Sequence, residues 1–484
     1  MSFNPNLTYF VDRLQGVSTN TFRLETQNKT TAKQNDIITF DLPSNAILNL
    51  RSLKVWCNGS CSAADAGSLA TSGARLPPID DLVERVEVSV GGVLLSQGTN
   101  FQNVLNEVLK SVSSEDCDSV VGHPEYVRNV SYVNGAGDGA GPITTTGNED
   151  YPSGVPSRFC IQKFHGFLAT ADPKLLDTSI IPDIRVRLYM ASNNVLTSSL
   201  GTAIGDGVAA APFEAGFANP AGPVVGGGKY ILTDIHATIE AIGLADQSYD
   251  QMIAAQMGQQ GFLEIPYKSY TSFEETHSGS SRFSVATQSL DRVWVSWRKT
   301  AFNAQAAPII VNGYKKQGGY IMGAIATGAN ATIDLGLPQY DVGGVLDTNK
   351  EKYKSQYFNF VAPQENMKMQ LQLNGAYMPQ FSANLGELYG ITRNSIEGAR
   401  DAKNMSLDQY LNNYCVQCFR LNMPDSEYSR TISGLDTRAV NLAGVVRTEN
   451  SAAGGGRDNL AINIFTEQTE CLRVGAGRAI EIIA

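Results

Sequence analysis

Apolar and polar residues alternate in short runs along most of the chain. In a β-strand successive side chains point to opposite faces, so a period of two predicts strands with one buried and one solvated face. Gly91-Gly92 follows one such run and Val93-Leu94-Leu95 returns from it, which predicts a hairpin. The pattern is typical of antiparallel sheets stacked as sandwiches. The clearest runs are Val86, Val88 and Val90; Ile184, Val186 and Leu188; Val293, Val295 and Trp297; Met367, Met369, Leu371 and Leu373; and Leu460, Ile462 and Ile464.

The chain divides into two β-rich halves of nearly equal length. Its 484 residues suit two domains of roughly 200 to 250 residues each better than one core. A strand-like segment from Tyr230 to Leu244 is followed by a helical pattern, and FLEIPYKSY then begins a new series of strands. We therefore place the boundary near residues 244–258. Lys54-Val55-Trp56 in the first half matches Arg292-Val293-Trp294 in the second, which suggests duplication, although chance alone would also explain so short a match.

Three short helices share one predicted start signal, the capping box, in which two side chains satisfy backbone N–H groups at the helix N-terminus. The three matches are Thr99-x-x-Gln102, Ser248-x-x-Gln251 and Ser406-x-x-Gln409. An apolar stripe follows each signal, and such stripes normally face a core. We expect these helices to lie against sandwich edges. The stripes are Phe101, Val104, Leu105, Val108 and Leu109; Tyr249, Met252, Ile253 and Met257; and Leu407, Tyr410, Leu411 and Tyr414.

The charge content excludes several classes of protein. Only 17 % of the residues are charged, below the roughly 25 % of an average soluble domain, and 42 % are hydrophobic, which argues against disorder. The net charge of −10 is spread along the chain without a basic stripe, so we expect no direct sequence-specific contact with nucleic acid. No stretch approaches the roughly 20 apolar residues of a membrane span, and MSFNPNLTYFVDRLQG lacks the pattern of a secretory signal.

Seven cysteines indicate free thiols, because an odd number in a long chain without a predicted secretory signal is typical of a reducing compartment. Cys57 and Cys61, together with the Cys415-x-x-Cys418 pair, would supply the four sulfur ligands of a tetrahedral zinc site. However, YCVQCFRLNM has the pattern of a strand, in which residues three apart point to opposite faces. We therefore predict buried structural thiols, with no metal and no cofactor.

The ionisable residues show no catalytic pattern. Asp80-Asp81 and Glu274-Glu275 are adjacent, and adjacent strand residues face opposite ways, whereas the two carboxylates of a glycosidase flank one bond. Among the scattered histidines, His236 alternates with apolar neighbours, so we expect it to face solvent or a subunit contact, and we expect His165 to be structural. We predict no catalytic residues and no enzymatic activity. The histidines are His123, His165, His236 and His277.

One acidic stretch and three long connections complete the candidate sites. Glu115, Asp116, Asp118 and Glu125 lie within 113–126, but their spacing matches no known cation-binding loop, so a solvated loop is the preferred interpretation. Long connections rich in small residues occupy 134–148, 201–228 and 324–345. Such loops are usually functional surface features or disordered. None contains a phosphate-binding motif in the required context.

Several segments resemble, in their order and spacing, the double jelly-roll major capsid proteins of the adenovirus-like lineage. The likeness is to the proteins of polinton-like viruses, virophages and nucleocytoplasmic large DNA viruses, and it spans the chain from about residue 20 onward, except for the small-residue stretch 191–228. In the first half it rests on IITFDLPSNAILNLRSLKVWCNG, LPPIDDLVERVEVSVGGVLLSQGTNFQNVLNEVL, IIPDIRVRLYMA and YILTDIHATIEAIGLADQSYDQMI. In the second half it rests on FLEIPYKSY, SRFSVATQSLDRVWVSW and SLDQYLNNYCVQCFRLNMPDSEYSRTISGLDTR.

The resemblance implies an all-β fold of two consecutive eight-stranded antiparallel jelly rolls with a few short helices. It divides the chain into an N-terminal arm at 1–20, a first roll at 21–245, an inter-roll helix or linker at 246–258 and a second roll at 259–484. It further implies a homotrimer that forms a pseudo-hexameric capsomer of an icosahedral virion shell, assembled inside the host cell. The implied partners are neighbouring capsomers, penton and minor or cement capsid proteins, and a membrane beneath the shell.

Two other classes of function stay open from the sequence alone. A jelly-roll binding module, such as a viral fibre or lectin-like protein, would gather aromatic and acidic residues on its loops, whereas the long loops here are mostly Gly, Ala, Ser and Thr. A jelly-roll enzyme would need a carboxylate pair. For a capsid protein we expect outward towers from 113–158 and 301–356, with the arm at 1–20 on the opposite, inner rim.

Overall fold

The computed structural model describes residues 17–62, 72–75, 77–95, 100–112, 158–195, 197–200, 229–244, 255, 257–259, 261–299, 315–316, 320–321, 356–358, 360–364, 366–396, 410, 414–423, 433–438, 442–449 and 460–483. The acidic stretch 113–126, the long connections, and Thr99, Ser248 and Ser406 of the predicted capping boxes lie outside these residues. So does nearly all of the two predicted towers. Within the described residues, no helix is both long enough and apolar enough to cross a membrane.

The first half of the chain forms two antiparallel sheets. The β1 sheet has the strand order β1-β11-β3-β7, with β8 paired to β3, and the β2 sheet has the order β2-β9-β5-β6. Strands distant in sequence are therefore neighbours, as Greek-key connections produce. The strands are β1 (Val17–Glu25), β2 (Ile37–Asp41), β3 (Ile47–Ser62), β5 (Val83–Val90), β6 (Val93–Leu94), β7 (Arg158–Ile161), β8 (Leu175–Asp177), β9 (Ile184–Met190) and β11 (Lys229–Leu244).

The second half repeats this arrangement. The β12 sheet has the order β12-β21-β14-β19, with β22 paired to β21, and the β13 sheet has the order β13-β20-β17-β18. Numbered within each half, and leaving out short added strands such as β8 and β22, both halves have sheets 1-8-3-6 and 2-7-4-5. Each half is thus an eight-stranded jelly roll. The strands are β12 (Phe262–Thr276), β13 (Ser280–Val285), β14 (Leu290–Lys299), β17 (Lys368–Leu373), β18 (Ala376–Asn384), β19 (Val416–Arg420), β20 (Leu442–Glu449), β21 (Leu460–Gly475) and β22 (Ile480–Ile483).

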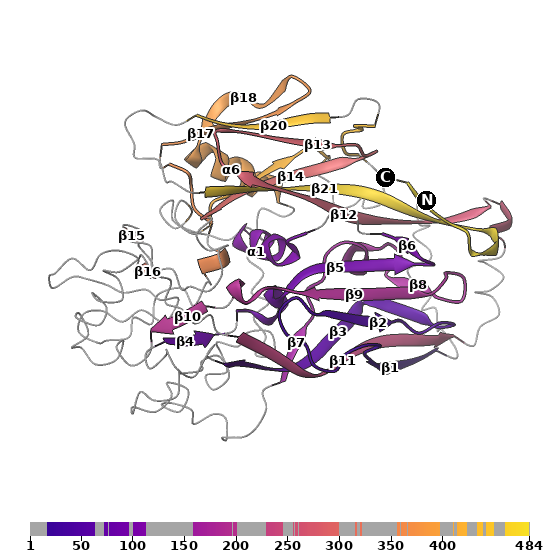
Figure 1. Ribbon diagram of the computed structural model, residues 1–484. Helices are drawn as coiled ribbons and strands as arrows, with labels where there is room; N and C mark the ends of the chain where they lie inside the picture. Colours follow the sequence, from indigo (N-terminus) through magenta and orange to yellow (C-terminus); the bar gives the residue numbers. More distant parts are fainter. Residues whose placement is uncertain are drawn as a thin grey trace, which may run out of the picture.

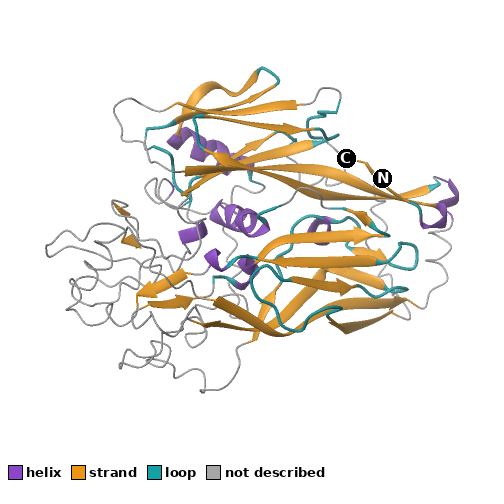
Figure 2. Ribbon diagram, viewed as in Figure 1, coloured by secondary structure: helices purple, strands orange, loops and turns teal. Residues whose placement is uncertain are grey.

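The four sheets are stacked in one order, which Figure 1 shows from bottom to top: the β1 sheet, the β2 sheet, the β12 sheet and the β13 sheet. Among the described residues helices are few and short, and one of them, α1, lies between the two rolls (Figures 1 and 2). The remaining elements are β4 (Ser72–Arg75) paired with β10 (Thr197–Leu200), β15 (Lys315–Lys316) paired with β16 (Tyr320–Ile321), η2 (Ile79–Leu82), α1 (Gln102–Val112), α3 (Phe167–Thr170), η4 (Asn193–Val195), η7 (Gln356–Phe358), α6 (Leu385–Ser395) and η8 (Ala476–Arg478).

The alternating runs form the inward faces of the sheets, as the sequence predicts. Every apolar residue named in the five runs is at most 5 % exposed. The predicted hairpin joins β5 to β6, and Gly91 and Gly92 adopt φ values of +57° and +85°. Such angles are those of a type I′ turn, whose twist matches that of the flanking strands.

The helices differ from the predictions in two ways. Helix α1 begins at Gln102, because Phe101 before it has a φ of +58° and cannot continue a helix toward Thr99. It lies between the rolls and is buried on nearly every side, so the predicted edge position is wrong for this helix. Helix α6 was not predicted, although Asn384 and Glu387 form a full capping box at its start.

The outer limits of the predicted segments are only partly described. Strand β1 begins at Val17, within the segment that the sequence assigned to the N-terminal arm. In the predicted inter-roll helix at 246–258, residues 255 and 257–258 are helical, as is 259 beyond it, and the others lie outside the described residues. Strand β11 ends at Leu244 and β12 begins at Phe262, on either side of this segment.

We predict that Gly444→Ala lowers the free energy of unfolding by about 1–3 kcal/mol, the cost of overpacking a core. Gly444 lies opposite Phe283 between β20 and β13, and an added Cβ would lie 2.2 Å from the ring of Phe283. Chemical denaturation measures the change. Gly390→Ala is the control, because Gly390 lies within α6 with nothing within 4 Å of its Cβ position. That variant should gain up to about 1 kcal/mol from helix propensity. Equal stability of the two variants would contradict the packing argument.

Candidate functional site: the interface between the two rolls

The β12 sheet is buried on both of its faces. The first nine residues of its central strand, β21, are all buried, although they include Asn463, Thr466 and Glu467. Along β14, Val293 and Val295 belong to the core of the second roll, whereas Trp294 belongs to a cluster shared with the first roll. The sheet is therefore the wall between the rolls.

Aromatic packing joins the first roll to this sheet. The ring of Tyr267 on β12 meets that of Phe167 on α3 edge-to-face, with centroids 5.3 Å apart. Its hydroxyl donates to the Glu470 carboxylate at 2.6 Å and lies 3.3 Å from the carbonyl oxygen of Leu95. One β12 side chain thus contacts two segments of the first roll.

Hydrogen bonds that use at least one backbone group also cross between the rolls. The N–H of Asp172 donates to the carbonyl of Pro266 at 3.0 Å, and the N–H of Lys268 donates to the hydroxyl of Thr170 at 2.8 Å. Arg478, beyond β21, donates to the carbonyl of Ser179 at 2.6 Å. Because backbone groups are fixed in position, these bonds set the register of one roll on the other.

Arg298 is the most buried cation of the interface, with no exposed side-chain surface. Its Nε donates to Asn463 at 2.9 Å, and one Nη donates to Glu274 at 2.8 Å. The guanidinium lies 4.7 Å from the ring centroid of Tyr357 and 5.8 Å from that of Phe101 in the first roll. A guanidinium over aromatic rings is stabilised by their π-electrons. Arg298 therefore connects three strands of the second roll to the start of α1.

Glu467 lies at the centre of a second cluster of buried polar groups. Its carboxylate is 4 % exposed and accepts from Arg292 at 3.3 Å and from the indole N–H of Trp294 at 3.3 Å. Nearby, Asp291 accepts from Thr469 and is ion-paired with Lys268. Buried charges are tolerated only when they are paired and hydrogen-bonded, as they are here.

On the first-roll side, the polar groups of α1 pair with η2. Asn106 donates to the carboxylate of Asp81 at 2.6 Å, and Lys110 contacts Glu107 at 2.7 Å and Asp81 at 3.9 Å. Burial raises the pKa of Asp81 well above its usual range, and the charge of Glu107 raises it further. Burial acts to lower the pKa of Lys110, but the two carboxylates outweigh it and the net pKa is raised. Lys110 therefore stays charged beside the two carboxyl groups.

His165 lies against the second roll, with its ring centroid 6.1 Å from that of Tyr270. Its Nε2 atom is buried and finds no hydrogen-bond partner among the described residues. Burial, together with the charges of Lys163 and Lys110, lowers the pKa of His165 to about 4. The imidazole is therefore neutral at physiological pH.

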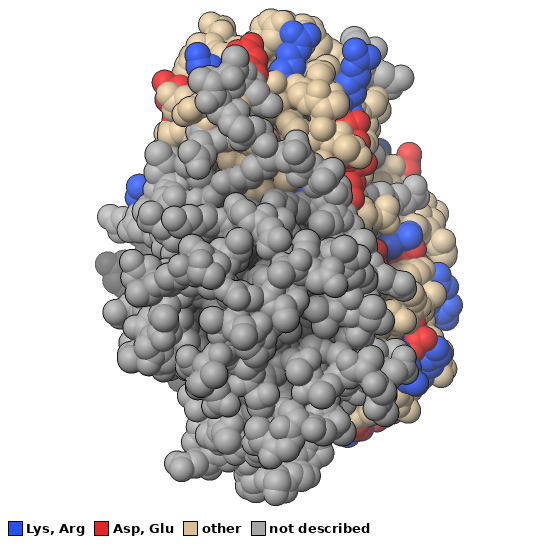
Figure 3. All heavy atoms as spheres, turned by 60° about the vertical axis from the view of Figure 1, so that its left-hand side comes forward, with Lys and Arg blue, Asp and Glu red and all other residues tan. Residues whose placement is uncertain are grey.

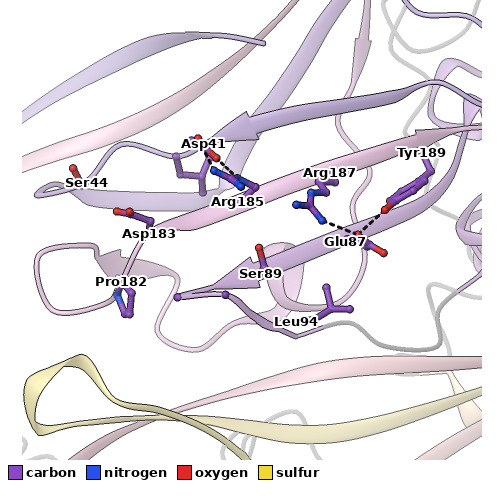
Figure 4. Close-up of a pocket in the computed structure, with 13 residues that line it drawn as sticks. Asp41, Ser44, Glu87, Ser89, Leu94, Pro182, Asp183, Arg185, Arg187 and Tyr189 are labelled. Atoms are coloured by element: carbon purple, nitrogen blue, oxygen red, sulfur yellow. Dashed lines mark hydrogen bonds and ion pairs between the residues drawn. The ribbon is translucent and has the colours of Figure 1, made fainter. Parts of the chain in front are cut away.

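A polar groove follows the outer face of the β2 sheet (Figure 4). Its volume is about 790 Å³. Arg185 donates to Asp41 at 2.6 Å, and Glu87 accepts from Tyr189 at 2.8 Å and faces Arg187 at 3.7 Å. These groups are engaged with one another across neighbouring strands. The groove is a salt-bridged sheet face, and no nucleophile paired with a base lines it.

The structure shows on which side of the β12 sheet Cys415 and Cys418 lie. Cys415 lies in the core of the second roll, whereas Cys418 lies in the cluster shared with the first roll. The two thiols therefore face opposite sides of the β12 sheet, as predicted, and they cannot bind one metal ion. Burial raises the pKa of Cys57 and Cys418 far above the usual thiol value. Within the described ranges, no three His, Cys, Asp or Glu side chains are grouped as metal ligands.

Two expectations about ionisable residues need correction. His236 does not face solvent; it is 5 % exposed and lies 3.0 Å from the guanidinium of Arg158. It still alternates with the inward residues Ile235 and Ala237 and lies on the outer face of the β1 sheet, directly opposite Trp56, so the alternative expectation of a subunit contact stays a prediction. Asp80 and Asp81 lie in the 3-10 helix η2, not in a strand. They still have separate partners, since Asp80 accepts from the backbone N–H groups of 162 and 163.

The described surface mixes both signs of charge. On the face in Figure 3, Lys and Arg side chains lie next to Asp and Glu side chains over the second roll and along one edge of the first. A nucleic-acid-binding face would gather basic residues. The described part of this face therefore has the mixed charge expected from the sequence.

We predict that Arg298→Met lowers the free energy of unfolding by about 1–3 kcal/mol, because it leaves the buried amide oxygen of Asn463 without its hydrogen-bond donor and removes the ion pair with Glu274, while keeping much of the packing volume. Denaturant titration measures the loss. The control is Arg282→Met on β13, where the arginine is exposed and the change should be close to neutral. A similar small effect at both positions would show that the Arg298 cluster does not stabilise the interface.

We predict that acid weakens the interface through His165. The unfolded chain gains a proton at His165 near pH 6.5, whereas the folded chain gains it only near pH 4. The free energy of unfolding contributed by this site therefore falls as the pH decreases through that window, by about 3 kcal/mol in total. Denaturation of the wild type and His165→Gln at several pH values measures this. Parallel pH profiles of the two proteins would contradict the prediction.

No protein-family model matches this chain, and no curated protein sequence matches it. Solved structures do match over nearly its whole length. One is the capsid of the virus PBCV-1, with a TM-score of 0.53, 11 % identity, and coverage of 98 % of each chain. Another is the PBCV-1 protein VP54 fitted into a reconstruction of the virophage Sputnik, with a TM-score of 0.53, 12 % identity and the same coverage. The Faustovirus major capsid protein has a TM-score of 0.51 at 10 % identity and covers 98 % of this chain and 92 % of its own.

At such low identity the similarity concerns the fold. It includes both rolls, and it agrees with the strand order described above. The resemblance that the sequence indicates is thus confirmed at the level of architecture. The chain has the double jelly-roll fold of these viral major capsid proteins.

Proposed function

We propose that this chain is a viral major capsid protein whose homotrimers form pseudo-hexameric tiles of an icosahedral shell. One observation carries the proposal: two rolls of identical strand order pack side by side through a buried interface. The buried arginines of the covered sheet are ion-paired. A fold alone does not define a function. A rigid pair of equivalent modules, however, is what a pseudo-sixfold tile requires from each of three chains.

The interface within the chain supports this role in a second way. The β2-sheet side of the first roll meets the β12 sheet of the second, so unlike faces of equivalent modules are in contact (Figure 1). Repeated contacts between unlike faces generate rings when the rotation closes. Three copies would then present six rolls around one axis.

The finer assignments follow from this proposal. The arm at 1–20 would lie on the inner rim, the first roll at 21–245 and the second roll at 259–484 would form the shell, and 246–258 would link them. Penton proteins, minor or cement proteins, neighbouring capsomers and a membrane under the shell would be the partners, in the virion. The charged groups described above act by fixing the rolls, and we propose no catalytic role for them.

We predict a stable trimer in solution, with a mass three times the 52.1 kDa of one chain. The low charged fraction is consistent with surface that a partner covers. Size-exclusion chromatography with light scattering at micromolar concentration measures the mass, and negative-stain images should show hexagonal outlines. A monodisperse monomer would overturn the proposal and favour a jelly-roll binding module of the fibre or lectin type.

A further inference from the structure

The two rolls expose different sides at the two ends of the stack. Between the rolls, the β2-sheet side of the first, with α1, faces the β12 sheet of the second (Figure 1). The outer face of the β1 sheet lies at one end of the stack, and the β13 sheet lies at the other. The β1 sheet at one end has the strand order 1-8-3-6, like the β12 sheet, and the β13 sheet at the other end has the order 2-7-4-5, like the β2 sheet. The two ends therefore correspond to the two sides that meet between the rolls of one chain.

Trp56 and Trp294 occupy equivalent places in the two rolls. Each lies on the third strand of its roll, on β3 and β14 respectively. Trp56 is directly opposite Cys160 on the sixth strand, and Trp294 is directly opposite Cys418 on the sixth strand. The tryptophan match noted in the sequence is therefore a match in three dimensions.

The hydrogen bonds of the two indoles are equivalent as well. The N–H of Trp56 donates to the hydroxyl of Thr238 at 3.0 Å, and the N–H of Trp294 donates to the carboxylate of Glu467 at 3.3 Å. Each acceptor is on the eighth strand, opposite the basic residue that stands two positions before the tryptophan. Both indoles therefore lie on the outer face of a 1-8-3-6 sheet, beside the eighth strand.

Their burial differs. Trp294 is only 3 % exposed and belongs to the cluster shared between the rolls, because the first roll of the same chain covers it. Trp56 is partly exposed, and among the described residues no second roll lies over the outer face of the β1 sheet. Tryptophan is one of the residue types enriched at the centre of protein interfaces.

We propose that the outer face of the β1 sheet, centred on Trp56, docks the second roll of a neighbouring copy of this chain. This inference rests on the proposed trimer and names the surfaces that form it. The occupant is the segment of β18 and α6. In the first roll, the residues that follow the fifth strand, including α1, are among those that cover the β12 sheet. In the second roll β18 is itself the fifth strand, and α6 follows it directly.

The chemistry of the two surfaces fits this pairing. Strand β18 carries Tyr377 and Phe381, which are 38 % and 54 % exposed. Around Trp56, Arg158 is ion-paired with Asp234 at 3.2 Å, and Arg23 lies 3.9 Å from the same carboxylate. An aromatic centre within a polar, ion-paired rim is the usual composition of a protein interface.

Two substitutions test the surfaces from opposite sides. Trp56→Glu and Phe381→Glu should each raise the concentration at which the trimer dissociates about tenfold or more, measured by light scattering over a dilution series. Because the two positions lie on different rolls, a folding defect at one leaves the other informative. Ile37→Glu is the matched control: it replaces an apolar strand residue that is 37 % exposed on the β2 sheet, and it should leave the trimer intact.

A photoreactive phenylalanine derivative at position 56 of the full chain gives the direct readout. Irradiation of the trimer should cross-link two chains, and peptide mapping should place the partner site within 376–395. A cross-link to the β1 sheet of the other copy, or a Trp56→Glu trimer as stable as the wild type, would overturn this inference while the trimer stands. A wild-type chain that is monomeric would instead overturn the proposed function.

Discussion

Burial of the β12 sheet on both faces is the constraint on which the rest of the molecule depends. A sheet that faces a core on one side and another domain on the other has no solvated face, so its polar groups must be satisfied within the protein. Arg298, Glu467 and Asp291 have partners of this kind, drawn from several strands. These pairs lie within the second roll and allow its sheet to be covered, whereas the contacts of Pro266, Tyr267 and Lys268 with the first roll position the two rolls against each other.

The sequence predicts which residues form the inward, apolar face of each sheet, but it does not predict what lies against the opposite face. Alternation identifies which residues share a face, and the apolar set then marks the inward side, as for Val293, Val295 and Trp297. It does not say what covers the polar set. Arg298 and Asn463 have the pattern of solvent-facing residues, yet they are at most 1 % exposed, because a domain far away in the sequence lies over them. The alternation of apolar and polar residues therefore predicts the two rolls but does not predict the interface between them.

Long-range contacts and local backbone conformation limited the remaining predictions. Arg158 lies against His236 on the outer face of the β1 sheet and helps to bury it, and the positive φ of Phe101 moved the start of α1. Neither feature has a sequence signal comparable to a glycine. By contrast, the capping box of Asn384 and Glu387 is a sequence signal for α6, because asparagine is as favourable an N-cap residue as serine.

The difference between the two tryptophan sites shows how one fold serves two kinds of interface. At the covered site the indole partner is the carboxylate of Glu467, which needs the buried cation of Arg292 beside it. This carboxylate is buried once the rolls of one chain have folded together, and a permanently buried carboxylate is tolerated because a cation pairs with it. At the open site the partner is the neutral hydroxyl of Thr238. A hydroxyl costs little whether the face is wet or covered, so this face suits a surface that is exposed to water before assembly and buried after it. The charge difference between two equivalent positions therefore follows from when each face is buried, during folding or during assembly.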